Sequence, residues 1–360
     1  MTTPTTIVAL DAAPLNVPLH EPFVIATGRL EAVRNVLVRV TLASGVVGYG
    51  EAAPFEAISG ENQATILATL ATCRDLVVGQ DVTRLRQVAQ TVKGVFHIQT
   101  AARAGLEMAL LDALTRAWGV PVYQFLGGAS DWVETDMTVP IVPPDDARRL
   151  AADIRQRGIH VVKTKVGKRI EDDIARLHAI REGFPACDLI LDANAGYTAN
   201  EALRVLDRLD RQGIQPVLFE QPCAETDWAG MRLVTQRSPV PVAADETCRT
   251  ANDALRIAEE GAAHVVNIKL MKSGVLEALD IAAVARAAQL GLMIGGMIET
   301  KLAMTCSAHI AAGLGGFRYI DLDTPMLLAE EPFQGGYRQA GAVYSLDHIQ
   351  AGLGIEPVNP

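Results

Sequence analysis

The sequence predicts an α/β protein, a modified (β/α)-barrel of the TIM type with an α+β domain beside it. Short apolar runs alternate with helical patterns over residues 126–324, which is typical of parallel strands joined by helices. Charged residues end five of these runs at steps of about 24–28 residues, the length that a strand, a helix and two short loops need. They are Lys165, Asp192, Glu220, Asp245 and Lys269. Residues 1–125 instead show strand patterns followed by helical ones.

The first domain begins with extended patterns. Strands are expected at 8–17, 36–42 and 46–51. A turn at Ser44 and Gly45 joins the last two strands into a hairpin. Residues 61–117 have a helical pattern, clearest over 100–118, where apolar residues recur at helical spacing. Residues 325–360 are irregular, and we expect them to complete this domain.

From residue 126 onward the pattern becomes a regular alternation. Strands are expected at 133–141, 161–166, 188–192, 216–220, 241–245, 264–270, 292–296 and 317–323. Helices are expected at 145–157, 171–182, 199–212, 251–260, 274–289 and 300–312. About seven of these strands fit a barrel, and the eighth position stays open.

Composition limits the partners of the chain. Its 360 residues suffice for a barrel and a smaller domain, because single cores stop growing near about 250–300 residues. The net charge of −10 and the pI of about 5.2, without a basic stripe, argue against nucleic acid and anionic membrane as partners. We expect no secretory signal and no membrane span. Five cysteines without CxxC spacing predict free thiols in a reducing cytoplasm, while a homo-oligomer stays open.

Two lysines stand in the strand expected at 161–166. Lys163 and Lys165 are two residues apart, so both side chains lie on one face of the strand. We expect burial and the neighbouring cation to lower each pKa, which would make a general base near neutral pH. An exposed lysine pair on an edge strand is the alternative.

Three carboxylates end successive strands at Asp192, Glu220 and Asp245. Oxygen ligands without nearby His or Cys suit a hard cation, so we expect Mg²⁺ here. One strand-end acid could equally cap the next helix, as Asp192 could, but three at the same position favour the metal. Asn194 and Glu246 are placed to support these ligands, or they are ordinary loop residues.

Lys269 ends the strand that follows Asp245. Around a barrel, Lys165 and Lys269 lie on either side of the three acid-bearing strands and would face a bound substrate from opposite sides. Two such lysines and a divalent cation suit proton transfer at a carbon next to a carboxylate, with inversion when one lysine removes a proton and the other returns one. A Schiff-base lysine is the competing use, but it does not explain three carboxylates.

These features resemble the enolase superfamily, in its muconate-lactonising subgroup. The matching residues are Lys163, Lys165, Asp192, Glu220, Asp245 and Lys269, together with the stretch 101–128. The resemblance implies a capping domain built from both termini and one Mg²⁺ per subunit. It also implies that loops near 15–30 and 50–60 fold over the barrel mouth.

Asp321 and Asp323 are two residues apart in the last expected strand, so both can point inward and bind a cationic group such as an α-ammonium. Either acid alone could cap a helix or pair with an arginine. The segments 135–138 and 295–301, with these two acids, are similar to the dipeptide epimerases. That resemblance implies that the metal holds the C-terminal carboxylate of a dipeptide and that the two acids hold its N-terminus. It also implies that Thr138 and Met297 line the pocket.

The side-chain preference depends on the first loop. Dipeptide epimerases that act on Ala-Glu carry an arginine there, whereas this sequence has Gly28 with Arg29 beside it. Without a cation in this loop an acidic side chain has no partner, which favours an apolar C-terminal residue in the substrate. A shift of the loop by one residue would instead place Arg29 at this position. Four apolar residues of the two loops form either a lid or interdomain packing. They are Phe23, Ile25, Phe55 and Ile58.

The sequence thus predicts a cytoplasmic isomerase, an Mg²⁺-dependent dipeptide epimerase that inverts the α-carbon of the C-terminal residue of an L,L-dipeptide. Lys165 and Lys269 would be the two bases, and Lys163 would neutralise charge at the substrate carboxylate. The alternatives on the same scaffold are an Ala-Glu epimerase, an N-acylamino acid racemase, an o-succinylbenzoate synthase and a muconate-type cycloisomerase. A non-catalytic barrel protein is disfavoured because no acid, base or metal position is missing.

Overall fold

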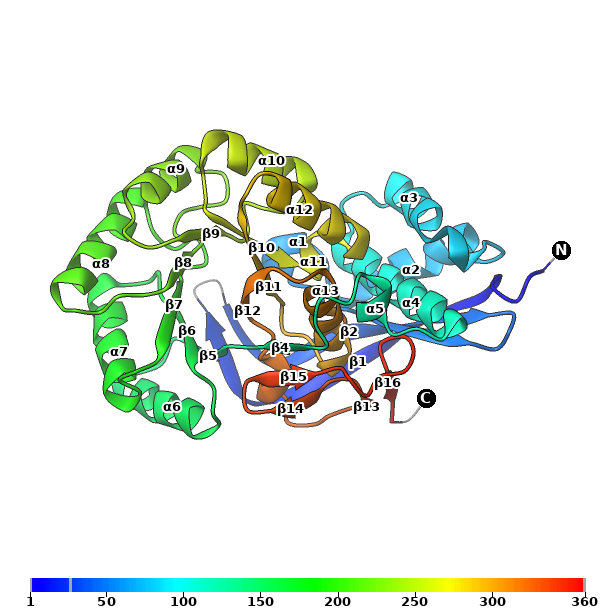
Figure 1. Cartoon of the computed structure of the whole chain (residues 1–360), viewed down its shortest axis with the longest axis horizontal. Helices are drawn as coiled ribbons and strands as arrows, with labels where there is room; N and C mark the ends of the chain where they lie inside the picture. Colours follow the sequence, from blue (N-terminus) through cyan, green and yellow to red (C-terminus); the bar gives the residue numbers. More distant parts are fainter. Residues whose placement is uncertain (1, 26–27, 359–360) are drawn as a thin grey trace.

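The computed structural model of the protein describes residues 2–25 and 28–358, with side chains except at 22–30 and 57. A curled parallel sheet with helices on its outside occupies one side, and an antiparallel sheet packed on helices occupies the other (Figure 1). The predicted fold class, a barrel with an α+β capping domain, is confirmed.

The barrel sheet has eight parallel strands in the described part of the chain, each paired with the next along the sequence. They are β5 (Met137–Val139), β6 (Val161–Lys165), β7 (Asp188–Asp192), β8 (Leu218–Glu220), β9 (Val242–Ala244), β10 (Val265–Lys269), β11 (Gly291–Gly295) and β12 (Phe317–Ile320). The backbone N–H of Asp136 donates to the carbonyl of Ile320 (2.9 Å), which joins the two ends of the sheet. All strand C-termini therefore open on one rim.

Helices follow most of these strands, and the longer ones cover the outside of the sheet (Figure 1). They are α6 (Pro144–Gln156), α7 (Ile170–Gly183), α8 (Ala199–Arg211), α9 (Trp228–Arg237), α10 (Ala251–Glu260), α11 (Leu270–Ser273), α12 (Val275–Ala287) and α13 (Lys301–Leu314). Local sequence sets where several begin. Thr198 caps α8 in a capping box with Glu201, and Thr250 caps α10 with Asp253.

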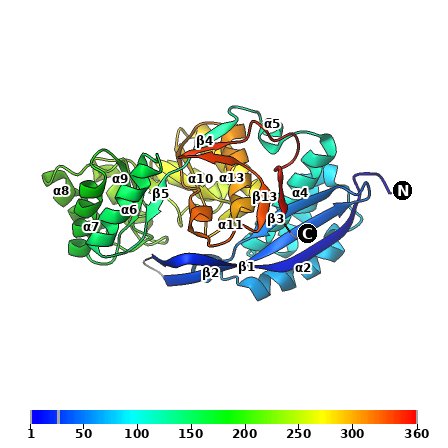
Figure 2. The same ribbon diagram turned by 90° about the horizontal axis from the view of Figure 1, so that it is seen from below.

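The N-terminal residues form the capping domain. Its strands are β1 (Ile7–Ile25), β2 (Gly28–Leu42) and β3 (Val47–Ala52), and its helices are α1 (Glu56–Ser59), α2 (Gln63–Val77), η1 (Val82–Arg84), α3 (Leu85–Val95), α4 (Thr100–Trp118) and α5 (Val122–Phe125). Helix α4 is buried on all sides from Ala101 to Thr115, and apolar residues occupy most of these positions. Strand β3 packs directly on it: a Cβ at Gly50 would lie 2.0 Å from the carbonyl oxygen of Gly105. The β1–β2 hairpin extends from this sheet toward the barrel (Figure 2).

The C-terminal segment returns to both parts. It contains η2 (Thr324–Leu327), β13 (Phe333–Gly335), β14 (Arg338–Ala340), β15 (Val343–Ser345) and β16 (Ile355–Pro357). Strand β15 pairs with β14 and with β4 (Trp132–Glu134), and β13 pairs with β16. Buried Asp112 of α4 accepts hydrogen bonds from the backbone N–H of Tyr49 (2.9 Å) and of Leu353 (2.7 Å). One carboxylate thus ties β3, α4 and the chain end together.

Several sequence predictions about elements are wrong in detail; strands β1 and β2, for example, are longer than the expected 8–17 and 36–42. The strand expected at 133–141 splits into β4 and β5, because β4 pairs with β15, a partner about 200 residues away that local pattern cannot reveal. The eighth barrel strand exists as β12, but it ends at Ile320, so Asp321 and Asp323 lie beyond it. Helix α9 was not expected; Met231 and Val234 are its only large buried apolar side chains, too few for a clear period.

Two further features concern membrane spans and cysteines. In the part of the chain that the structure describes, no helix is long and apolar enough to cross a bilayer. All five cysteines are buried, and none forms a disulfide.

Candidate active site

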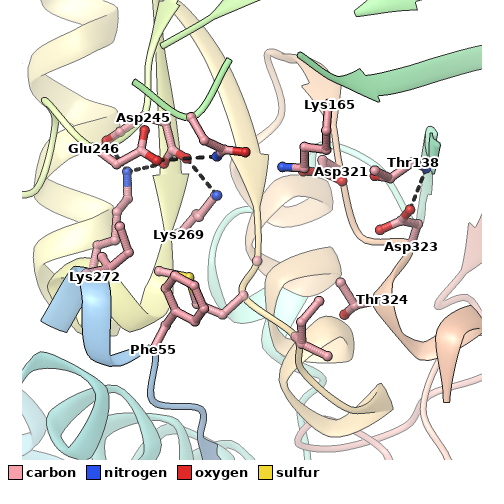
Figure 3. Close-up of a pocket in the computed structure, with 15 residues that line it drawn as sticks. Phe55, Thr138, Lys165, Asp245, Glu246, Lys269, Lys272, Asp321, Asp323 and Thr324 are labelled. Atoms are coloured by element: carbon pink, nitrogen blue, oxygen red, sulfur yellow. Dashed lines mark hydrogen bonds and ion pairs between the residues drawn. The ribbon is translucent and has the colours of Figure 1, made fainter. Parts of the chain in front are cut away.

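Charged side chains gather at the C-terminal rim of the barrel. In the strand pairing, Lys165 lies beside Asp192, and Asp192 lies beside Glu220. Asp245 follows directly after β9, and Lys269 ends β10. They surround or underlie a cavity that the barrel shares with α1, the first helix of the capping domain (Figure 3).

The residues expected from the sequence fall into two layers. Nine of them line the cavity: Thr138, Lys165, Asn194, Asp245, Glu246, Lys269, Met297, Asp321 and Asp323. Lys163, Asp192 and Glu220 do not line it but lie behind it, each at most 1% exposed. The side chains of Phe23, Ile25 and Arg29 and the surroundings of Gly28 lie outside what the structure describes, so the prediction about the first loop stays a prediction.

Lys165 and Lys269 enter the cavity from opposite walls. Lys165 Nζ donates to Asp192 Oδ2 (2.6 Å), and Lys269 Nζ donates to Asp245 Oδ2 (2.7 Å). Three strands separate β6 from β10, and the two ammonium groups face one another across the open space (Figure 3). A substrate carbon held between them would have one lysine on each face.

Lys163 lies between the strand-end acids and Asp321. Its Nζ lies 2.6 Å from Asp321 Oδ2, 2.8 Å from Glu220 Oε2 and 3.1 Å from Asp192 Oδ2. Burial alone would lower the pKa of Lys163, but the carboxylates of Asp192, Asp321 and Glu220 outweigh burial and raise that pKa well above its ordinary value. Lys163 is therefore a fixed positive charge.

The prediction of a lowered pKa is wrong for Lys163, because burial is outweighed by the neighbouring carboxylates. Lys269, for which no pKa prediction was made from the sequence, behaves alike: burial lowers its pKa, but its ion pair with Asp245 raises that pKa above the ordinary value. The sequence argument counted neighbouring cations and burial, and it left out the carboxylates that end the adjacent strands.

The three strand-end acids differ in their surroundings. Burial raises the pKa of Asp245, but Lys269 and Lys272 outweigh it and hold that pKa well below its usual range. Burial, together with Asp192, raises the pKa of Glu220 to about 7. Glu220 Oε1 accepts a hydrogen bond from Asn267 Nδ2 (2.7 Å), whereas its Oε2 has no hydrogen-bond partner beyond the ion pair with Lys163.

Asn194 and Glu246 support this layer from the loops. Asn194 adopts a left-handed backbone conformation (φ 42°), and its N–H donates to Asp192 Oδ1 (3.0 Å). Its Nδ2 donates to Glu246 Oε1 (3.3 Å). Burial, with Asp245 next, raises the pKa of Glu246 to about 8.

A third acid lies beside the two that follow β12. Carboxylate oxygens of Asp136, Asp321 and Asp323 lie within 4.8 Å of one another. Asp323 Oδ2 accepts a hydrogen bond from the Thr138 N–H (2.6 Å), but both carboxylate oxygens of Asp136 lack a hydrogen-bond partner although the residue is only 2% exposed. Three buried acids in contact form a site that a cation would stabilise.

The apolar part of the wall comes from two segments. Phe55 and Ile58 come from α1 and the residue before it, and Met297 and Ile298 come from the loop after β11. The Met297 N–H donates to buried Glu299 Oε1 (2.6 Å), which fixes that loop. All four apolar side chains are partly exposed to the cavity.

The sequence analysis missed several polar residues of this region, of which Lys272 and Asp136 matter most. Lys272 lines the cavity, and its Nζ donates to Asp245 Oδ1 (2.7 Å), to the Asp245 carbonyl and to the Asn267 carbonyl (2.9 Å). Its position three residues after Lys269 was a usable signal, since helix α11 turns it back toward the site. Asp136 stood inside the segment 135–138 that had been singled out, but only the fold places it beside Asp321 and Asp323.

The rim of this parallel barrel carries opposed lysines and buried carboxylates, and a capping domain covers it. These features define a barrel enzyme that works by acid/base catalysis. Residues 7–127 match the mandelate racemase/muconate lactonizing enzyme N-terminal domain, and residues 146–359 match the enolase C-terminal domain-like family. The chain therefore belongs to the enolase superfamily, as a relative of mandelate racemase and muconate lactonizing enzyme.

Named relatives share nearly the whole chain. An aromatic dipeptide epimerase from Herpetosiphon aurantiacus is 49% identical over 353 residues, which cover 98% of this chain and 99% of that protein. An L-Ala-D/L-Glu epimerase from Thermotoga maritima is 38% identical, over 89% of this chain and 93% of that protein. The structure of a dipeptide epimerase from Enterococcus faecalis, complexed with Mg and L-Leu-L-Tyr, superimposes with a TM-score of 0.94 at 34% identity, covering 98% of this chain and 99% of that one.

Proposed function

We propose that this protein is an Mg²⁺-dependent dipeptide epimerase that inverts the α-carbon of the C-terminal residue by moving a proton between two lysines. The observation that carries the proposal is the placement of Lys165 and Lys269 on opposite walls of one cavity, with buried carboxylates between them. Relatives named as dipeptide epimerases, at up to 49% identity, support it.

The metal would be held by Asp192, Glu220 and Asp245. These residues fit a hard divalent cation, because all three donors are carboxylates on neighbouring strands and buried Glu220 Oε2 has, in the described part of the chain, no polar partner other than the Lys163 ammonium. Mg²⁺ bound there would stabilise the negative charge that develops on the substrate carboxylate when the α-proton leaves. Lys163, fixed in its charged form, adds a second positive charge from behind.

The two lysines of the cavity supply the proton transfers. For an L residue one of them takes the α-proton, and the other, in its charged form, gives a proton to the opposite face. Each lysine is held in the free enzyme by one carboxylate, Asp192 for Lys165 and Asp245 for Lys269. If those carboxylates turned to a metal, the lysine amines would be free to act on the substrate.

The free ammonium group of the dipeptide would bind at Asp321 and Asp323, with Asp136 as a third acid behind them. One positive charge among three buried carboxylates removes part of their mutual repulsion. An N-acylated amino acid has no such charge. The acid cluster therefore favours a free dipeptide over the substrates of an N-acylamino acid racemase, an o-succinylbenzoate synthase or a cycloisomerase.

The C-terminal side chain of the substrate would contact the apolar wall. Phe55, Ile58, Met297 and Ile298 form this wall, and the lysines are the only cations among the described residues that line the cavity. We infer a preference for apolar C-terminal residues. The alternative is an Ala-Glu epimerase, which the side chain of Arg29 would favour if it reached the cavity.

The cysteines bear on the compartment in which the enzyme works. Five free, buried cysteines suit a reducing compartment such as the cytoplasm. We propose a small-molecule substrate and no nucleic-acid partner.

A substrate panel tests the proposal. The enzyme with Mg²⁺ is incubated with L,L-dipeptides that end in apolar or acidic residues and with the N-acetylated form of each, and the products are separated on a chiral column. We expect L,D products from free dipeptides, fastest for apolar C-terminal residues. Turnover of the N-acetylated compounds alone would contradict the proposal, and a preference for acidic residues would replace it with the Ala-Glu alternative.

A further inference from the structure

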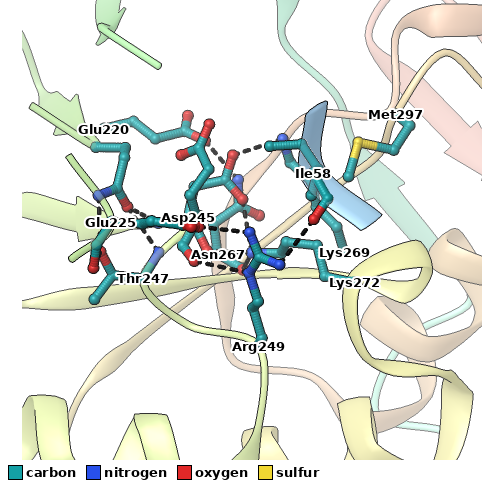
Figure 4. Close-up of polar contacts among 12 residues, drawn as sticks. Ile58, Glu220, Glu225, Asp245, Thr247, Arg249, Asn267, Lys269, Lys272 and Met297 are labelled. Carbon is teal, nitrogen blue, oxygen red and sulfur yellow. Dashed lines mark hydrogen bonds and ion pairs between the residues drawn. The ribbon is translucent and has the colours of Figure 1, made fainter. Parts of the chain in front are cut away.

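Arg249 lies outside the cavity, where three segments of the chain meet. It follows β9 in the barrel and precedes α10. Its guanidinium donates to the carbonyl of Ile58 (2.8 Å) through Nη1, to Glu225 Oε2 (2.5 Å) through Nη2 and to the carbonyl of Glu246 (3.2 Å) through Nε (Figure 4). One side chain thus bridges the loop after β8, the loop after β9 and the capping domain.

The capping-domain end of this bridge is a helix too short to be stable in isolation. Helix α1 has four residues and ends at Gly60 in a left-handed conformation (φ 70°). A single helical turn is unstable in isolation, because its nucleation fixes many dihedral angles for few hydrogen bonds. Within the described part of the chain, the carbonyl of Ile58 accepts a hydrogen bond only from Arg249. The position of α1 therefore depends on contacts with the barrel.

The barrel end of the bridge is firm. The backbone N–H of Arg249 donates to Asp253 Oδ2 (3.1 Å), which also belongs to the capping box at the start of α10. Glu225 pairs with the guanidinium from the side. Glu246, whose carbonyl Arg249 contacts, comes directly after Asp245 and binds Asn194 through its side chain. The arginine is anchored to the segment that carries the proposed metal ligand.

We propose that Arg249 is a positioning residue that holds α1 against the barrel and so places Phe55 and Ile58 against the substrate side chain. This inference rests on the proposed function for its substrate but not for its geometry. Arg249 touches neither the lysines nor the acids of the proton-transfer site through its side chain. Its loss should therefore weaken binding of substrates with large apolar C-terminal side chains and leave the chemical step largely intact.

The variant Arg249→Met removes the fork of donors and keeps most of the side-chain volume, and Arg249→Lys restores one charged donor. Arg256→Met is the matched control: this arginine of α10 pairs with Glu260 (2.6 Å) and stacks on Trp228, so it makes comparable contacts on the barrel surface away from α1. The first measurement is hydrogen exchange of the backbone amides of Ser59 and Gly60, which donate within α1 and its end. The second is kcat and KM for dipeptides that end in Ala, Leu or Phe.

For Arg249→Met we expect faster exchange at Ser59 and Gly60 than in the wild type and in Arg256→Met. We expect KM to rise by about tenfold for Leu and Phe, the loss of one charged hydrogen bond, with a smaller rise for Ala and little change in kcat. Arg249→Lys should recover part of both effects. Unchanged exchange at Ser59 and Gly60, or a KM increase that is equal for Ala, Leu and Phe, would overturn the proposal. If the wild type epimerises no dipeptide, the proposed function fails, while the exchange measurement still decides the role of Arg249.

Discussion

Lys163 Nζ lies 2.6 Å from Asp321 Oδ2, a contact that joins the second strand of the barrel to the segment after the last one. The same ammonium pairs with Asp192 and Glu220, so a single buried cation links the proposed metal ligands to the proposed ammonium site. The acids that would hold the metal for the C-terminal carboxylate of a dipeptide and the acids that would bind its ammonium therefore share one positive charge.

Replacing Lys163 should damage stability and activity together. Lys163→Met leaves three buried carboxylates without their common partner, and removing one partner of a buried ion pair costs about 3–5 kcal/mol. We expect the free energy of unfolding to fall by this amount in urea denaturation, and turnover to be lost. Lys168→Met, at an exposed lysine just beyond the same strand, is the control and should change neither. Wild-type stability in Lys163→Met would show that the acids do not depend on this cation.

The two opposed lysines should be separately essential. Lys165→Met and Lys269→Met should each lower epimerisation by about 10²–10⁴-fold, the usual contribution of a positioned acid/base group. Each variant should also lose α-proton exchange from one of the two epimers and keep more of it with the other, because each lysine serves one face. Exchange of L,L- and L,D-dipeptides in D₂O, followed by mass spectrometry, measures this. Equal loss from both epimers in both variants would contradict the assignment of one lysine to each face.

The acids after β12 should matter only for substrates with a free ammonium. Asp321→Asn and Asp323→Asn should each lower kcat/KM for free dipeptides by about 10²-fold, because charge-assisted hydrogen bonds to a buried cation are lost. Asp136→Asn should raise KM more than it changes kcat. Asp188→Asn, at the exposed start of β7, serves as the control. If kcat/KM is unchanged in both Asp321→Asn and Asp323→Asn, the ammonium site is wrong and the substrate lacks that charge.

The same site predicts an acid limb in the pH profile. Burial, together with Asp321, raises the pKa of Asp323 to about 6. Below that pH Asp323 gains a proton and loses the charge that attracts the ammonium, so kcat/KM should fall as the pH drops through about 6. The profile of kcat/KM reports the free enzyme, which makes it the right measurement. In Asp323→Asn the residual activity should lack this limb, and a limb that persists there belongs to another group.

A buried carboxylate fastens the capping domain to the barrel. Glu51 of β3 accepts hydrogen bonds from the N–H (2.9 Å) and hydroxyl (2.5 Å) of Thr300 and from the N–H of Ala303 (3.2 Å), so it caps α13 from the other domain. Glu51→Ala leaves these donors unpaired and should lower the free energy of unfolding by about 2–4 kcal/mol in urea denaturation. Glu51→Gln keeps one oxygen acceptor and should lose less. Equal stability of Glu51→Ala and wild type would contradict this role.

Much of the barrel could be predicted because each strand–helix unit repeats the same local pattern of apolar and charged residues. The apolar runs that end in Lys165, Asp192, Glu220 and Lys269 are β-strands in the structure. Their spacing follows from the length of a strand, a helix and two loops, and parallel strands place these charged ends on one rim. The boundary errors come from partners far away in the sequence. The pairing of β4 with β15 is one example, since nothing in the sequence near residues 132–134 indicates it.

The site was harder to predict where it depends on contacts between units. Charged residues at strand ends indicated a cation site, but their mutual pairing reversed the expected pKa shift of Lys163. Asp136 and Arg249 act through residues about 185 or more positions away, Asp321 and Ile58, so only the fold brings them into the account. A local pattern gives the chemistry of a residue but not its neighbours across the barrel.

The most direct test of the central claim is proton NMR of the enzyme with Mg²⁺ and L-Ala-L-Phe in D₂O. Two-base proton transfer predicts that the α-proton signal of the C-terminal residue disappears while that of the N-terminal residue stays, that the L,D epimer accumulates, and that a chelator stops both changes. Retention of the C-terminal α-proton with this and other L,L-dipeptides, or exchange at the N-terminal residue instead, would contradict the account.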